Sequence, residues 1–314
     1  MEIWKDKKIK EIIETLKIKL RKNNVSTKRD HKLSAPRFVF VCGKEFVEGE
    51  ETIRELVINE LKTYKIHNDY GRENSRVLCV VSEHLYIQDL AEDIFVFEKM
   101  LAEISKSIIV VSESAGTFCE LGAFLMDKEI CKKTIVINED KEEYRESFIT
   151  KGPIKMLQEI HDKNVILHSG VQRIKSSTEY IHRMEAIAND ELVISINEKA
   201  EELILMSLIY EFCNIVELFQ PLEEYEIGWI YKEIKGFDTY TIKNTSEHKI
   251  STFRKVILLM NRMNVLKKKD GLYYLNEKIS CYNVMFNMTR KEYNDIRLKY
   301  LNRLEKCQPQ RMVV

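Results

Sequence analysis

The chain has 314 residues, which is enough for two domains of ordinary size. Its composition, with 44% hydrophobic and 32% charged residues and only four prolines, is that of a globular protein and excludes low-complexity classes. The formal net charge of zero is unevenly distributed: residues 1–40 carry 12 Lys/Arg against 5 Asp/Glu, residues 241–314 carry 16 against 6, and residues 41–240 carry 22 against 39. Basic ends around an acidic middle indicate contact with a polyanion or, alternatively, neutralisation of the middle by the ends within an oligomer.

Three features of the sequence indicate the cellular compartment and whether the chain binds a metal ion. Residues 1–24 are basic and amphipathic without a signal-peptide core, and no apolar run approaches the ~18 residues of a membrane span. The seven cysteines lie far apart and form no CxxC pair, which favours reduced thiols. The seven histidines show no HExxH or other paired metal-ligand spacing. We therefore expect a cytoplasmic protein with no membrane partner, no metal site and no bound cofactor.

The first elements in chain order are a helix and a linker. Apolar residues from Ile9 to Leu20 follow the spacing of one helix face, which predicts an amphipathic helix over residues 3–22. Residues 23–36 have the polar composition of a connection. We therefore interpret residues 1–35 as a basic amino-terminal helix and linker.

A strand–helix alternation follows. Five short and almost wholly apolar runs are typical of buried strands: residues 37–42, 76–81, 107–111, 134–138 and 164–168. Helical periodicity separates them, and Pro153 lies near the first position of the helix before the last strand. This pattern predicts an α/β domain over residues 36–170, with a flavodoxin- or Rossmann-like parallel sheet covered on both faces. Ligands of such sheets bind at the carboxyl ends of the strands, where Gly43, Ser82-Glu83 and residues 112–117 lie.

The carboxy-terminal half is predicted to be mostly helical. Residues 171–220 indicate a helical connector. Residues 221–280 contain a helix, a longer helix over 246–265 and a hairpin whose turn is Asp270-Gly271, which together predict a winged helix-turn-helix. Residues 281–314 are interpreted as a basic tail.

The segment SESAGTFCELGAF (112–124) follows the third predicted strand and allows two interpretations. In the structural one, Thr117 and Glu120 form a capping box at the start of a helix, or Ser114 caps the helix a turn earlier, and Gly116 relieves the turn. In the functional one, the free amides and positive dipole end of the helix bind an anion or a sugar hydroxyl. Gly116 then lets the ligand approach the backbone, and Ser112, Ser114 and Thr117 supply hydroxyls.

The carboxylates near this segment suit glycosidic chemistry. Glu120 can meet the positive charge that develops at an anomeric carbon when an N-glycosidic bond breaks, as the nucleophile of retaining glycosidases does. Glu83, after the second strand, can bind the leaving base or a ribose hydroxyl; alternatively, it is a solvated residue at a strand end.

At these residues the sequence resembles the nucleoside 2-deoxyribosyltransferases and, more closely, the deoxyribosyltransferase-like effector proteins of bacterial retrons. The shared features are FVFVCG (38–43), the acidic residue Glu83, the segment ending ELGAF (120–124), and SFITKGP (147–153). The resemblance covers most of the chain and extends in pattern to a carboxy-terminal winged helix. Ala115 stands where relatives often have proline or glycine.

The resemblance implies a toxin of the N-glycosidase type, with Glu120 as the nucleophile and NAD or a related nucleotide as the substrate. It implies as partners a retron reverse transcriptase and its branched RNA–DNA (msDNA and msrRNA), which hold the toxin in check until phage infection, in a homo-oligomer or higher assembly. The carboxy-terminal residues with which a neighbouring subunit completes the pocket of free-nucleoside transferases have no match here. We therefore expect hydrolysis rather than base transfer.

Six basic residues are candidates for nucleic-acid binding. Three lie on the predicted recognition helix and three on the wing: Arg254, Lys255, Arg262, Lys267, Lys268 and Lys269. Such side chains bind phosphates electrostatically and without sequence choice. Alternatively, the lysines are a solvated hairpin tip, or the winged helix docks protein only. Tyr273 and Tyr274 are expected to pack in the core rather than to stack on bases.

Two other functions remain open at this point. The chain can be a nucleotide-sensing α/β domain that controls a winged-helix DNA regulator without turnover. It can also be a phosphoribohydrolase of nucleoside monophosphates, since those enzymes use a similar Gly-Thr-x-x-Glu turn.

Overall fold

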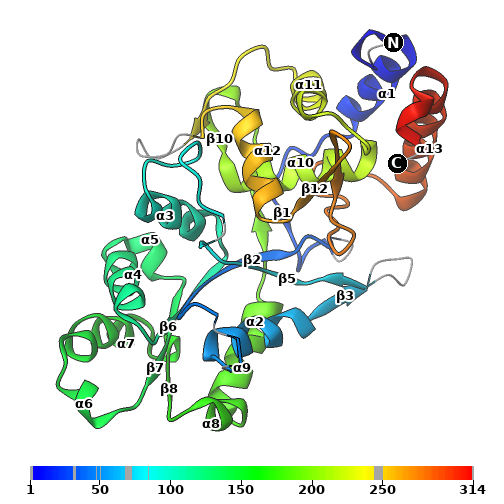
Figure 1. Ribbon diagram of the computed structural model, residues 1–314. Coiled ribbons are helices and arrows are strands. Elements are labelled where there is room, and N and C mark those ends of the chain that lie inside the picture. The colour runs from blue at the N-terminus through cyan, green and yellow to red at the C-terminus, as the bar shows by residue number, and fades with distance from the viewer. Residues whose placement is uncertain are drawn as a thin grey trace.

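The computed structural model describes residues 3–30, 33–46, 48–49, 51–67, 73–83, 85–243 and 250–312 (Figure 1). Its centre is a five-stranded parallel sheet in the order β5-β2-β6-β7-β8. The strands are β2 (Arg37–Cys42), β5 (Val77–Val80), β6 (Ser107–Ser112), β7 (Thr134–Glu139) and β8 (Val165–His168). Counted along the chain, this is the 2-1-3-4-5 order of flavodoxin-like sheets. The predicted α/β class and parallel sheet are confirmed.

The sheet is buried on both faces because its strands are apolar at almost every position. In β2, Phe38, Phe40 and Cys42 belong to one core and Val39 and Val41 to the other, as the alternation of side chains along a strand requires. The first face is covered by α3 (Ile94–Ile104), α4 (Ala115–Met126), α5 (Lys128–Cys131) and α7 (Lys155–His161). The second face is covered by α2 (Ile53–Thr63), α8 (Val171–Lys175) and α9 (Thr178–Asn189). Consequently, Cys42 and α4 lie on the same side of the sheet.

The shorter elements connect these layers. Pro153 lies within a single π-helical turn that leads directly into α7, rather than at the first position of a helix. The short elements are β3 (Lys65–His67), β4 (Glu73–Ser75), α6 (Glu142–Arg145), η2 (Thr150–Ile154), η3 (Asp162–Asn164), η4 (Ala200–Glu202), β10 (Leu203–Ile204), β11 (Ile242–Lys243) and η5 (Pro309–Met312). Within the described ranges, no helix combines the length and the apolar character that crossing a membrane requires.

The amino-terminal helix is shorter than predicted. After a turn of 3-10 helix, η1 (Ile3–Lys5), Asp6 caps α1 (Lys7–Ile18) by accepting hydrogen bonds from the amides of its first turn. The helix ends before residue 22 because Leu20 forms a β-bridge with Phe286. The predicted linker contains β1 (Val25–Ser26), which pairs antiparallel with β9 (Val193–Ile194). This segment therefore belongs to the folded structure.

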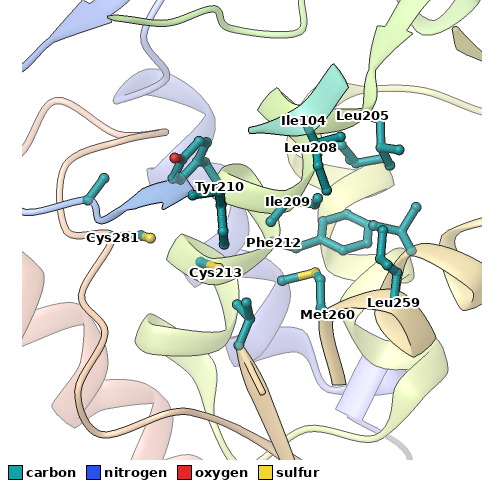
Figure 2. Close-up of a cluster of buried hydrophobic side chains, with 14 of the residues drawn as sticks. Ile104, Leu205, Leu208, Ile209, Tyr210, Phe212, Cys213, Leu259, Met260 and Cys281 are labelled. Carbon is teal, nitrogen blue, oxygen red and sulfur yellow. The ribbon is translucent and has the colours of Figure 1, made fainter. Parts of the chain in front are cut away.

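Helix α10 (Leu205–Phe219) joins the sheet to the carboxy-terminal half. Thirteen of its residues are buried, as expected for a helix enclosed on all sides. Figure 2 shows Ile104 of α3 in one cluster with Leu208 of α10 and Met260. At the start of β2, the hydroxyl of Tyr210 donates a hydrogen bond of 2.8 Å to the carbonyl of Pro36. One hydrophobic core therefore runs from the first face of the sheet into the carboxy-terminal helices.

The predicted hairpin is confirmed. Strands β12 (Leu266–Lys269) and β13 (Leu272–Leu275) pair around Asp270 and Gly271, whose φ angles of 50° and 82° are those of a type I′ turn. Helix α11 (Glu224–Lys235) also lies where expected. The longer helix predicted over 246–265 is shorter: α12 (Phe253–Arg262) begins after its cap Thr252, and residues 246–249 lie outside the described residues.

The prediction of a basic tail at residues 281–314 is wrong. Most of the segment is α13 (Arg290–Cys307), which packs against α1 and α10 (Figure 1). Its apolar stripe is sparse, because it consists of Tyr293, Ile296, Tyr300 and Leu304 among many charges. Arg303 also forms an ion pair with the buried carboxylate of Asp6. Six of the seven basic residues of this segment therefore lie on a helix that packs against the rest of the fold, and the seventh, Arg311, lies on η5.

A buried ion pair between α10 and α11 provides a test of this architecture. Lys235 Nζ donates to Glu211 Oε1 at 2.7 Å and to the carbonyl of Asn197 at 2.6 Å, and the Lys235 and Glu211 side chains are 5% and 0% exposed. The hydroxyl of Tyr231 donates to Glu211 Oε2.

We predict that Lys235→Met lowers the free energy of unfolding by about 3–5 kcal/mol, because it leaves a buried carboxylate without its cation. Urea denaturation measures the loss. Adding Glu211→Gln should recover some of it, whereas the exposed control Lys243→Met should change little. A single variant as stable as the native chain would contradict the prediction.

Candidate functional site

The predicted site residues meet where the strand order reverses. In this topology, the switch point lies between β2 and β6, and ligands bind outside the carboxyl ends of such strands. Gly43 follows β2, Glu83 follows β5, and residues 112–117 span the end of β6 and the start of α4. Because these three strands are neighbours in the sheet, the fold brings the segments to one edge.

The start of α4 decides between the two structural interpretations of its capping. Ser114 is the N-cap: the Ser114 amide donates to Thr117 Oγ1 at 3.0 Å, and the Thr117 amide donates to Ser114 Oγ at 3.3 Å. The capping box is therefore Ser114 with Thr117, and the expected box of Thr117 with Glu120 is wrong. Glu120 lies beyond the first turn of the helix and has no capping role.

The hydroxyls of this segment are partly engaged within the protein. Ser112 Oγ donates to the carbonyl of Ile137 at 3.2 Å, and Thr117 Oγ1 donates to the carbonyl of Ser114 at 2.9 Å. Ser112 and Thr117 are both buried, whereas Gly116 is exposed. A Cβ at Gly116 would come no closer than 3.7 Å to Ser114 Oγ, so the fold itself does not require glycine there. Contacts of these residues with a ligand remain predictions.

Arg54 joins two of the loops at this edge. Its guanidinium donates to the carbonyls of Gly43 and Lys44 at 3.0 and 3.2 Å, and its two terminal nitrogens contact both oxygens of Glu83, with Nη2–Oε2 at 2.6 Å. A Cβ on Gly43 would lie 2.8 Å from Arg54 Cβ, so glycine is needed for this close approach. Glu83 is therefore half of an ion pair while remaining exposed at the strand end, and its contact with a ligand remains a prediction. Arg54 was not predicted from the sequence, where its only signal was an arginine on the apolar face of a predicted helix.

Glu120 has the most unusual environment of the predicted residues. Its Oε2 atom is inaccessible to solvent and has no hydrogen-bond partner. Burial, and next the negative charge of Glu98, raise the pKa of Glu120 to about 7, while the Cys42 thiol opposes the shift by hydrogen bonding. A carboxyl that is half-ionised near neutral pH can act as a nucleophile or exchange a proton with a substrate.

Glu98 and Ser82 complete the group of side chains beneath α4. Ser82 Oγ donates to Glu98 Oε1 at 2.7 Å, and both residues are buried. Burial raises the pKa of Glu98, and the Ser82 hydrogen bond opposes this effect. Ser82 belongs to a segment that the sequence placed at the ligand-binding edge, whereas Glu98 was not predicted; its available signal was a carboxylate within the apolar face of the helix at 94–104.

The cavities of the molecule do not single out this edge. A small cleft of about 120 Å³ lies beside the Arg54–Glu83 pair and is bordered by Phe46 and Ile58. A larger cavity of about 730 Å³ lies between α1, α11 and α12, where Arg254 is the one lining residue that the sequence predicted as functional. We place the candidate site at the carboxyl edge of the sheet because the candidate reactive side chains lie there. The volume of a cavity does not by itself indicate a reaction.

The six predicted nucleic-acid residues lie on α12 and β12, which contact each other. Arg254 and Arg262 are exposed and Lys255 is half-buried. On the exposed strand, Lys267 pairs with Glu277, Lys268 lies over the ring of Tyr273 at 5.1 Å, and Lys269 is solvated at the hairpin tip. Tyr273 is buried and Tyr274 is half-buried, so the expected packing of Tyr273 is confirmed. Binding of nucleic acid remains a prediction.

Residues 50–268 match the family model described as "STM3845 retron effector protein". The chain is 25% identical over 252 residues to "Retron Ec73 putative ribosyltransferase/DNA-binding protein" of Escherichia coli, which covers 76% of this chain and 77% of that protein. It is 32% identical over 111 residues to "Retron Ec86 putative ribosyltransferase/DNA-binding protein" of Escherichia coli, which covers 32% and 36% of the two chains. The segment that matches the family contains Glu83, Glu98 and Glu120.

The raised pKa of Glu120 predicts a pH-dependent gain of stability on its replacement. A carboxyl whose pKa is about 7 in the folded state and 4.5 as a model value binds its proton more tightly when folded, so the native chain loses stability as pH rises from 4.5 to 7. We predict that Glu120→Gln, which cannot ionise, exceeds the native free energy of unfolding by about 1–3 kcal/mol at pH 8 and that the difference shrinks towards pH 4.

Denaturation at both pH values measures the two differences. The exposed Glu129 serves as a matched control, since Glu129→Gln should show no such trend. If Glu120→Gln exceeds the native free energy of unfolding by the same amount at pH 4 and pH 8, the fold does not disfavour the ionised form of Glu120 and the prediction is wrong.

Proposed function

Because the chain belongs to the STM3845 family of retron effector proteins, we propose that it is a defence toxin that cleaves the N-glycosidic bond of NAD or a related nucleotide through Glu120. Membership in this family associates the chain with a retron. The chemistry of the proposal rests on one observation: Glu120 is a largely buried carboxyl at the switch point of the sheet, with a free oxygen and no role in capping its helix.

The proposed reaction uses groups that surround Glu120. The ionised carboxylate attacks C1′ of the ribose, the bond to the base breaks, and water then hydrolyses the glycosyl ester to regenerate the carboxylate. The Arg54–Glu83 pair is suited to hold the ribose hydroxyls or the leaving base, because it presents charged hydrogen-bonding groups at the same edge. The word ribosyltransferase in the names of both relatives supports glycosyl chemistry of this class.

The carboxy-terminal half is proposed to attach the enzyme to its retron. Along the chain, this half contains α10, then Leu222, which forms a β-bridge with Tyr273, then α11, α12 and the β12–β13 hairpin. The elements of a winged helix follow one another in the same order, which supports the proposal. DNA-binding in the names of both relatives supports this assignment. The proposed partners are the retron reverse transcriptase and its msDNA with the attached RNA, within a cytoplasmic assembly that contains one or more copies of this chain.

The first experiment incubates the purified chain with NAD, ATP, AMP and deoxynucleosides and follows products by mass spectrometry. We expect release of nicotinamide or adenine by the native chain and none by Glu120→Gln, because an amide attacks poorly. Below pH 7, the rate should fall about tenfold per pH unit, since the attacking carboxylate becomes protonated.

Other outcomes separate the alternatives. Base release from a monophosphate but not from NAD would identify a phosphoribohydrolase. Binding without any product, with or without the reverse transcriptase complex, would identify a nucleotide-sensing regulator. Cleavage retained in Glu120→Gln would refute the assignment of the nucleophile.

A separate prediction concerns the wing. Replacing Lys267, Lys268 and Lys269 by glutamate should weaken nucleic-acid binding and flatten its salt dependence, because fewer phosphates are neutralised. Binding to the branched RNA–DNA is measured across a salt series, beside cleavage by the same protein, which should not change. The matched control reverses Lys128 and Lys132, which are exposed lysines at α5 on the other half of the molecule. Unchanged binding by the wing variant would contradict this role.

A further inference from the structure

The two basic ends of the chain come together in the fold. Helix α1 packs against both α11 and α13 (Figure 1). Near the end of α13, Arg303 binds the carboxylate of Asp6, which is the N-cap of α1, with Nε and Oδ2 2.7 Å apart. At the end of α1, Lys19 Nζ lies 2.7 Å from Oε1 of Glu292, in the first turn of α13. Each ion pair joins the start of one helix to the end of the other, so α1 and α13 run antiparallel.

A groove runs between these two helices. Its volume is about 490 Å³, and its walls are formed by residues of α1 on one side and of α13 on the other. Each wall is a single helix face, because lining residues recur at the i, i+4, i+7 spacing: Lys8, Ile12 and Thr15 on α1, and Lys299, Arg303 and Lys306 on α13. The lined stretch of each helix is about 10 Å long, at a rise of about 1.5 Å per residue.

The groove carries an excess of positive charge. Lys8, Lys299 and Lys306 are exposed, and none of them forms an ion pair with a carboxylate of the described residues. The fourth cation of the groove is neutralised by the N-cap of α1, and Glu11 is the one carboxylate among the described residues that line it. This local excess contrasts with residues 41–240, which carry 22 Lys/Arg against 39 Asp/Glu.

The phosphates of a nucleic acid fit this groove. Lysines bind phosphates as flexible point charges, and about 10 Å of groove spans about three phosphates of one duplex strand, at one per ~3.4 Å. Lys17 of α1 lines the larger cavity together with Arg254 of α12. The groove is thus connected through α1 to the helix already proposed to bind nucleic acid, which favours a nucleic acid over an acidic protein surface as its occupant.

We propose that the groove between α1 and α13 is a second phosphate-binding surface, in which Lys8, Lys299 and Lys306 hold the backbone of the retron nucleic acid beside the winged helix. This inference rests on the proposed function, because nucleic acid is a partner of the chain only there. The binding requires no particular base sequence, since ammonium groups contact phosphates and not base edges. It gives one role to both basic ends of the chain, which the wing alone does not explain.

The test measures, by fluorescence anisotropy across a salt series, how the full chain binds a labelled DNA duplex and a labelled single strand, both of mixed sequence. The triple variant Lys8→Gln, Lys299→Gln and Lys306→Gln should bind at least one of them more weakly at low salt. If the duplex occupies the groove, the slope of log K against log salt becomes shallower by about 2–3, because each phosphate contact contributes about 0.9. The native chain and the variant should converge at high salt, where electrostatic binding is lost.

Two further variants make the test specific. Replacing Lys128, Lys132 and Lys155 by glutamine makes the same change in net charge at exposed positions of α5 and α7, and it should leave the salt slopes unchanged. Glu11→Gln removes the exposed carboxylate of the groove and should strengthen binding at low salt. A gain of affinity cannot result from a loss of folding, so this variant keeps the inference testable if the triple variant is unstable.

Native affinity and slope in the triple variant, or no binding by the native chain at low salt, would overturn the inference. Native binding together with a changed oligomeric state, measured by sedimentation, would also overturn it and make the groove an interface between copies of this chain. Binding is read without cleavage, so the two proposals fail separately. Weaker binding by the triple variant supports the groove even if the native chain cleaves no nucleotide, in which case the proposed enzyme activity fails.

Discussion

Burying a guanidinium costs free energy unless hydrogen bonds compensate for it, and Arg54 makes several such bonds at the carboxyl edge of the sheet, where ligands of such folds bind. It bonds to two carbonyls after β2 and to both oxygens of Glu83 after β5. The side chain passes so close to Gly43 that any larger residue there would collide with it. The two loops beside the switch point are thus held by one side chain from α2. Burial and the charge of Glu98 raise the pKa of Glu120 most, and within this pair Glu83 raises that pKa more than Arg54 lowers it.

The continuous hydrophobic core connects this edge to the carboxy-terminal half. Helix α3 carries Glu98 near its middle and Ile104 at its end, and Ile104 packs in the cluster formed around α10 (Figure 2). In turn, α10 contacts α11, α12 and α13, and α13 contacts α1. The position of the buried carboxylate on α3 therefore depends on the packing of helices that lie far from it in the sequence. In physical terms, the proposed catalytic edge and the proposed docking half belong to one packed body.

The sequence predicted those features that depend on local pattern. The five strands were predicted correctly because they are buried on both faces and are therefore continuously apolar. The hairpin was predicted correctly because an Asp-Gly pair between two strands favours a type I′ turn. Glu120 was chosen as a candidate because a strand, a small-residue turn and a helix start follow one another in the chain and because this segment resembles that of the deoxyribosyltransferases; its role stays a prediction. Helix α13 was missed because its buried stripe is diluted by charges that indicate a tail. Arg54 and Glu98 were missed because their importance arises from contacts across the fold, which no window of sequence contains.

The hydrogen bonds at the start of α4 show that Glu120 does not cap this helix. A glutamate that caps a helix lies within the first turn and accepts backbone amides, which lowers the pKa of its carboxyl. In α4, Ser114 and Thr117 already satisfy those amides. Glu120 shows the opposite pattern, because burial and a neighbouring carboxylate raise its pKa and one of its oxygens has no partner. A carboxyl that the fold destabilises in its charged form does not stabilise the helix, and this property is consistent with the proposed role of Glu120 in the attack on C1′.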